Sequence, residues 1–94
     1  MKNIAYYLFV GTRGGETRAL IAKTLRHKPQ NAHQLANALR LDYKTIQHHL
    51  RILLDNNILT AVNKGKYGAV YFISPEMDAL WNNFRQIWER VGKK

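Results

Sequence analysis

Two histidines stand side by side in the stretch TIQHHLRIL, which covers residues 45–53. Imidazole nitrogens can bind a metal ion, transfer a proton near neutral pH or hydrogen-bond to a nucleic acid. Ile46 and Leu50 have helical spacing, and on a helix His48 and His49 would point about 100° apart. No Asp, Glu or His stands three or four residues from either histidine. We therefore expect no metal site on this helix.

The same helix would turn a polar face outward once its apolar residues face a core. This outer face would carry Tyr43, Lys44, Gln47, His48 and Arg51. We expect His48 to help read a nucleic acid, the alternative being an ordinary solvated side chain. His49 stands next to an apolar leucine, so we expect a half-buried ring that packs and hydrogen-bonds locally.

Gln47 is the stronger candidate for reading a base. Its amide can make two hydrogen bonds, to N6 and N7 of adenine in the major groove. Lys44 and Arg51 could reach guanine or a phosphate, and the sequence leaves both alternatives open.

The charge of the chain favours a polyanionic partner. Fifteen Lys and Arg stand against six Asp and Glu, which gives a net charge of +9. Between Arg13 and Lys66 there are ten basic and three acidic side chains, so most of the surplus lies within one region. A folded chain with this balance is expected to bind nucleic acid.

The sequence lacks the residues that enzymes, metal-binding proteins and membrane proteins usually carry. The chain has no cysteine, no nucleophile motif, no phosphate-cradling glycine loop before a helix and no paired carboxylates beyond helix-end acids. The longest apolar run, residues 4–10, is far below the roughly 20 residues that span a bilayer. We expect no enzyme activity, no catalytic residues, no metal or other cofactor, no small-molecule substrate, no membrane partner and a cytoplasmic location.

Three helices precede a hairpin in the expected order of elements. The first runs from about Glu16 to the stop at Lys28-Pro29, with Leu20, Ile21, Thr24 and Leu25 on its apolar face. The second begins at Asn31, with Gln34 in capping-box position. The third is capped by Asp42 and ends near Asn56-Asn57. A joint of about three residues between the second and third helices is typical of a helix-turn-helix.

A hairpin and a last helix complete the chain. The runs LTAVN (59–63) and AVYFI (69–73) favour two strands, joined by the basic tip KGKYG at 64–68. Ser74-Pro75-Glu76 is a strong helix start, and apolar residues then recur every three or four positions over 74–92.

Residues 16–73 resemble the winged helix-turn-helix of ArsR-type transcription regulators, above all in LDYKTIQHHLRILLDNNIL at 41–59. The resemblance implies a mainly α fold with a small β-hairpin. A chain of 94 residues is expected to form one domain, here residues 1–94. The resemblance also implies a recognition helix at about Tyr43 to Asn56 in the major groove and a wing on the backbone or in the minor groove. Two features depart from the family: Arg40 stands where the turn usually has glycine, and the cysteine ligands of its metal sensors are missing. Arg40 would adopt a left-handed conformation at a cost of roughly 1–2 kcal/mol, or the turn would differ.

The expected DNA contacts come from three places. The outer face of the recognition helix lies in the major groove, and the wing tip contributes basic and aromatic side chains. Helix starts offer hydroxyl groups and free backbone N–H groups to phosphates. The complete set is Asn31, His33, Tyr43, Lys44, Thr45, Gln47, His48, Arg51, Lys64, Lys66 and Tyr67.

The last helix carries more apolar surface than one small domain is expected to bury. The alternative is a helix whose apolar residues only close the core of a single chain. In the resembled family, terminal helices pair two protomers across a two-fold axis, so we expect a homodimer. The expected interface residues are Tyr7, Leu8, Leu80, Trp81, Phe84, Ile87 and Trp88.

Together these features predict a homodimeric transcriptional regulator that binds specific sequences of double-stranded DNA. Two alternatives stay open: a chromatin or RNA-binding protein of low specificity, which binds by charge alone, and a winged helix that serves as a protein-interaction module.

Overall fold

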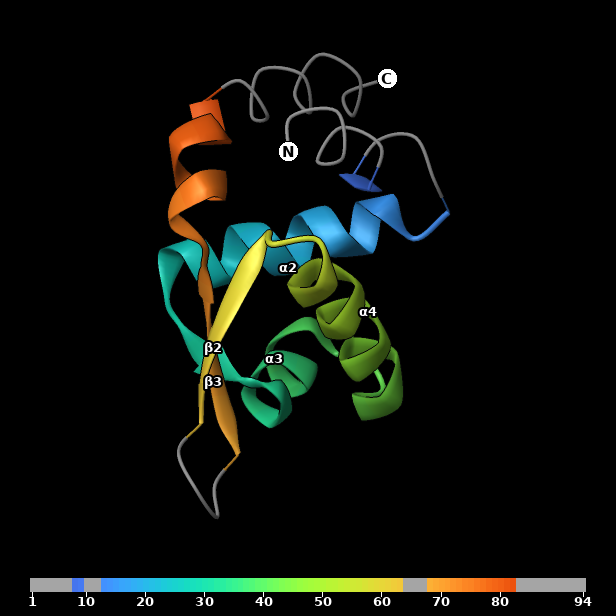
Figure 1. Ribbon diagram of the computed structural model, residues 1–94. Coiled ribbons are helices and arrows are strands. Elements are labelled where there is room, and N and C mark those ends of the chain that lie inside the picture. The colour runs from blue at the N-terminus through green and yellow to red at the C-terminus, as the bar shows by residue number, and fades with distance from the viewer. Residues whose placement is uncertain (1–7, 10–12, 64–67, 83–94) are drawn as a thin grey trace.

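The computed structural model describes residues 8–9, 13–63 and 68–82 (Figure 1). Its elements are α2 (Gly15–His27), β1 (Gln30–Asn31), α3 (Ala32–Leu39), α4 (Tyr43–Asp55), β2 (Leu59–Asn63) and β3 (Ala69–Ile73). A further helix begins after Ser74 and is described as far as residue 82. The predicted fold class, mainly helical with a small antiparallel sheet, is confirmed.

The starts of α3 and α4 are fixed by side-chain caps. Asn31 accepts a hydrogen bond from the Gln34 backbone N–H at 2.8 Å, and the Gln34 side chain accepts one from the Asn31 N–H at 2.9 Å. The Asp42 carboxylate accepts from the N–H groups of Lys44 and Thr45. Both predicted caps are therefore present, and they place the two helix starts within one residue of the expected positions.

The turn between α3 and α4 uses a left-handed residue. Arg40 has φ 56° and ψ 45°, which confirms the first of the two alternatives for this position. The N–H of Leu41 donates to the Ala36 carbonyl at 3.0 Å, and that of Arg40 donates to the Asn37 carbonyl at 3.4 Å. These bonds satisfy the last carbonyls of α3, so the turn keeps its tight geometry without glycine.

The end of α4 follows the same pattern. Asn57 has φ 61°, and the N–H of Ile58 donates to the Leu53 carbonyl at 2.9 Å. Ile58 and Leu53 are both fully buried, as expected for the hydrophobic contact that accompanies this kind of helix end. The chain thus leaves α4 at a fixed angle and enters β2 directly.

The sheet has one strand more than the sequence indicates. β2 and β3 form the predicted antiparallel hairpin, with Leu59 opposite Ile73 and Val62 opposite Val70. β1 pairs with the other edge of β3, so the strand order is β1-β3-β2. A two-residue strand carries no alternation that could reveal it in a sequence. Because β1 leads straight into α3, it fixes the start of that helix to the sheet.

The core lies between α2, α4, the sheet and the last helix (Figure 1). α3 packs beside α4, which matches the predicted helix-turn-helix. Ile21, Leu25 and Ile46 are fully buried, but Leu20 is 46% exposed. The expectation that Leu20 faces the core was wrong, because it falls one position outside the buried stripe of α2.

The last helix is joined to α2 by its first described turns. The Ser74 hydroxyl accepts the Met77 backbone N–H at 3.0 Å, which confirms the predicted cap. Arg26 of α2 contacts the Asp78 carboxylate at 3.0 Å, and its guanidinium lies 5.2 Å from the centre of the Trp81 ring. Within the described residues, no helix is both long and apolar enough to cross a membrane.

Candidate nucleic-acid interface

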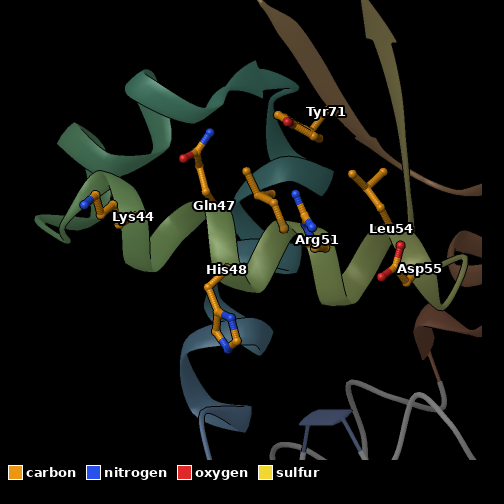
Figure 2. A pocket seen from close by; sticks show the side chains of 8 residues that line it. Lys44, Gln47, His48, Arg51, Leu54, Asp55 and Tyr71 are labelled. Carbon is orange, nitrogen blue, oxygen red and sulfur yellow. The ribbon is translucent and has the colours of Figure 1, made fainter.

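An open groove of about 700 Å³ runs along the outer face of α4. It is lined by Lys44, Gln47, His48, Leu50, Arg51, Leu54, Asp55 and Tyr71. Figure 2 shows that all but Tyr71 among the labelled residues come from α4, at the spacing of one helix face. The prediction that Lys44, Gln47 and Arg51 are exposed is confirmed. Ile46 and Leu53 form the buried face of α4, which packs on the core.

The side chain of Gln47 is hydrogen-bonded to Tyr43, whose ring stacks on a second ring. Its Nε2 donates to the Tyr43 hydroxyl at 3.0 Å, one turn earlier in α4. The Tyr43 ring in turn stacks on His33 of α3, with 4.2 Å between ring centroids and 13° between planes. Three residues that the sequence placed separately in the DNA-binding set therefore form one contiguous cluster.

His48 and Gln47 both line the groove, but as neighbours on a helix they leave α4 in different directions (Figure 2). Both are exposed, but only Gln47 points to the side on which Tyr71 lies. The pair of histidines divides as expected, with His48 outside and His49 inside. A nucleic acid centred on Gln47 would meet His48 only at its edge.

His49 is buried rather than half-buried, with 8% of its surface exposed. Its Nδ1 lies 3.2 Å from Nη1 of Arg18, a buried arginine of α2. Arg18 also donates to the backbone carbonyls of Leu8 and Arg13. The expected local bond is therefore a long-range one, and it ties α4 to α2 and to the chain that precedes it.

The pKa of His49 is lowered from its usual value, first by burial and then by the positive charges of Arg18 and His48. A neutral imidazole can accept a hydrogen bond at Nδ1, whereas an imidazolium has only donors. The contact with the Arg18 guanidinium therefore requires the neutral form. This geometry gives His49 a structural role in positioning α4.

Helix caps already use part of the backbone that the sequence offers to phosphates. The N–H of Thr45 donates to the Asp42 carboxylate, and the N–H of Asn31 donates to the Gln34 side chain. Helix caps compete with phosphates for the same N–H groups, since each group has one hydrogen to donate. The Thr45 hydroxyl stays exposed, so a contact through that group is still expected.

Tyr71 lines the groove, although the sequence offered it only as a strand residue. It stands opposite Gln30 of β1 and Ala61 of β2, in the middle of the sheet. Burial raises its pKa from the usual value, and Tyr43 adds to the shift. A strand whose side chains alternate between core and surface could have signalled this residue, but all of β3 is apolar or aromatic.

Some expected site residues lie outside the described residues. These are Lys64, Lys66 and Tyr67 of the wing tip, and Tyr7, Phe84, Ile87 and Trp88 of the expected dimer interface. Leu8 and Trp81 are only 7% and 6% exposed, so they belong to the core of a single chain and offer a partner little surface. Leu80 is partly exposed. Across residues 8–9, 13–63 and 68–82, no three His, Asp or Glu side chains gather as a metal site would require.

Comparison with solved structures finds the same fold. The reduced form of the transcriptional regulator YodB from B. subtilis is 19% identical, with a TM-score of 0.72 over 94% of this chain and 88% of that chain. The ST1889 protein from the thermoacidophilic archaeon Sulfolobus tokodaii is 17% identical, with a TM-score of 0.60 over 97% of this chain and 90% of that chain. A mutant of ZitR from Lactococcus lactis is 9% identical, with a TM-score of 0.61 over 80% of this chain and 60% of that chain.

Comparison with curated proteins gives no significant match. The family model of the bacterial regulatory proteins of the arsR family, however, matches residues 15–61, which run from α2 into β2. The match covers the whole helix-turn-helix and the start of the wing. The chain therefore belongs to the arsR family of bacterial regulatory proteins, and its fold and family are those of DNA-binding transcription regulators.

Proposed function

We propose that this protein binds specific sequences of double-stranded DNA as a homodimer, with α4 as the recognition helix in the major groove. One observation carries the proposal: Lys44, Gln47 and Arg51 line one exposed face of α4 at spacings of three and four residues. A major groove about 12 Å wide admits one helix, whose exposed side chains can then reach base edges.

Gln47 is the base-reading residue in this proposal, and Lys44 and Arg51 flank it along the same face. The Gln47 amide can pair with adenine through one donor and one acceptor. The flanking cations can bind guanine or a phosphate, and phosphate contacts set the register of the helix.

Phosphate contacts from other elements would orient the protein on the duplex. Lys64, Lys66 and Tyr67 of the wing tip are proposed to contact the backbone or the minor groove, and the Thr45 hydroxyl a phosphate near the start of α4. His48 would contact the edge of the interface. These assignments are supported by the net charge of +9 and by the exposure of the α4 residues.

The proposal of a homodimer is supported by the apolar residues that recur every three or four positions over residues 74–92 of the sequence. Leu80, Phe84, Ile87 and Trp88 are the proposed interface residues, because Trp81 is engaged in the core. Two recognition helices related by a two-fold axis would meet successive major grooves about 34 Å apart. The favoured target is then an inverted repeat.

The direct test is selection of bound sequences from a random duplex pool at about 150 mM salt, where binding by charge alone is already weakened. Enrichment of an inverted repeat, with half-sites about one helical turn apart, is the expected result. Binding without enrichment would instead favour a protein of low specificity, and binding to a random single-stranded RNA pool would separate the RNA-binding alternative. Loss of all binding would favour a protein-interaction module.

A further inference from the structure

The stack of His33 on Tyr43 joins the first turns of two helices. His33 is the second residue of α3 and Tyr43 the first of α4, and their rings lie almost parallel with centroids 4.2 Å apart. His33 is exposed and Tyr43 is 36% exposed, so the stack lies on the surface rather than in the core. A face-to-face contact of this kind fixes the plane of the phenol ring and hence the position of its hydroxyl.

The fixed hydroxyl in turn holds the Gln47 amide. The Gln47 Nε2 donates to the Tyr43 oxygen at 3.0 Å. An exposed glutamine without such a partner is free to rotate about its side-chain bonds and to present either end of its amide. Here the rotation is restricted by a partner that is itself restricted by α3.

The hydrogen bond changes what Gln47 can offer to a base. A primary amide has two N–H donors and one carbonyl acceptor. With one N–H donated to Tyr43, one donor and one acceptor are left for the major groove. Adenine presents one acceptor, N7, and one donor, the N6 amino group, whereas guanine presents two acceptors, N7 and O6. The restrained amide therefore matches adenine and lacks the second donor that guanine requires.

We infer that Tyr43, held by His33, is a positioning residue that restricts Gln47 to adenine and excludes guanine at one position of each half-site. The inference rests on the proposed function, in which Gln47 reads a base. It adds the exclusion of guanine and assigns that exclusion to two residues that act through Gln47.

The experiment starts from the sequences that the wild-type protein selects from a random duplex pool. The position read by Gln47 is the one whose preference is lost in Gln47→Ala. Affinities of wild type and Tyr43→Phe are then compared on duplexes with adenine or guanine at that position. Phenylalanine keeps the stack but removes the hydroxyl, so both amide N–H groups become free. Adenine-over-guanine discrimination is expected to fall about tenfold, with the salt dependence of binding unchanged.

Variants of His33 test the other half of the cluster. His33→Ala removes the stack and should lower the discrimination by about threefold, while His33→Phe supplies another flat ring and should restore it. His27→Ala is the matched control, because His27 is an exposed histidine at the end of α2, away from the cluster. Circular dichroism of each variant shows whether its total helix content equals that of the wild type.

The outcomes separate the inference from the function on which it rests. Selection without any position that depends on Gln47 overturns both. A position that depends on Gln47 but selects guanine in the wild type overturns the inference alone. So does an adenine preference that Tyr43→Phe leaves unchanged.

Discussion

At position 49, the neutral form of one imidazole holds several segments together. His49 accepts from Arg18 through Nδ1, and the same guanidinium donates to the carbonyls of Leu8 and Arg13. Gly14 lies against both side chains, since a Cβ there would come within 2.9 Å of the His49 ring and 3.1 Å of Arg18. The glycine, at φ 86°, thus leaves room for the contact.

The stability of the protein should depend on the protonation of His49. Its pKa is below 6.5 in the folded chain and about 6.5 in the unfolded chain, so the unfolded state binds a proton first as the pH falls. Neutral His49 therefore contributes fully to the free energy of unfolding above pH 6.5. This contribution is lost as the pH falls from 6.5 through the folded pKa, with a slope of at most about 1.4 kcal/mol per pH unit. Urea unfolding of wild type and His49→Gln between pH 7.5 and 5 measures it.

The difference in free energy of unfolding between wild type and His49→Gln should therefore shrink toward low pH. His27→Gln is the control, because His27 is exposed and makes no contact with Arg18 among the described residues. A difference that stays constant or grows as the pH falls would contradict a neutral His49.

Substitutions of Gln47 and Lys66 should affect DNA binding differently, one changing the base preference and the other the affinity for all sequences. Gln47→Ala is expected to cost about 1–3 kcal/mol on the selected site and to flatten the preference at one base, while Lys66→Ala should weaken all sequences alike. Lys66→Ala should also reduce the slope of log K against log salt by about one, since one phosphate contact is lost. Titrations on selected and random duplexes at several salt concentrations measure both. Equal effects of the two variants on random DNA would contradict base reading by Gln47.

At the scale of elements, the turn between α3 and α4 contains a residue in an unfavourable conformation. Arg40 sits in the left-handed region, where a residue with a Cβ is disfavoured by roughly 1–2 kcal/mol relative to glycine. Arg40→Gly should therefore raise the free energy of unfolding by about 1 kcal/mol, after the greater freedom of glycine in the unfolded chain is subtracted. Urea unfolding at pH 7 measures the change.

Arg40→Ala is the matched control for that turn. It removes the same charge and side chain but keeps the Cβ in the left-handed region, so its stability should stay within about 0.5 kcal/mol of wild type. Equal gains from alanine and glycine would mean that the arginine side chain, and not the backbone conformation, is the unfavourable feature.

For the whole protein, the proposed dimer is best tested at a position other than the buried residues of the last helix. Met77 and Trp81 are buried in a single chain, so replacing Trp81 would disturb folding as well as any interface. Ile87 belongs to the same apolar stripe in sequence. Ile87→Glu should yield monomers, because two charges would have to be buried across a two-fold axis.

Sedimentation equilibrium of Ile87→Glu measures that outcome. Val62→Glu is the control: Val62 is an exposed apolar residue, 42% accessible, on β2 of the hairpin. It should keep the wild-type mass. A dimeric Ile87→Glu would contradict the proposed interface, and a monomeric wild type would contradict the dimer itself.

Local sequence was enough to predict the helices, the two hairpin strands and the outward face of α4. Asn31, Asp42 and Ser74 act on N–H groups within three residues, so their capping can be inferred from local spacing. The apolar period of α4 likewise leaves Gln47 exposed, since a helix with one buried face must turn the other face to solvent. The two hairpin strands were also predictable from local sequence, because only the short segment 64–68 separates their β-branched and aromatic runs.

Contacts between distant residues depend on how the elements pack and could not be predicted from local sequence. Arg18 and His49 are 31 positions apart, and the stack of His33 on Tyr43 depends on the angle between two helices. β1 exists because the sheet offers it an edge, and Trp81 is buried because α2 packs against the last helix. Such contacts depend on packing between elements, whereas spacing in a sequence constrains only neighbours within about one turn or one hairpin.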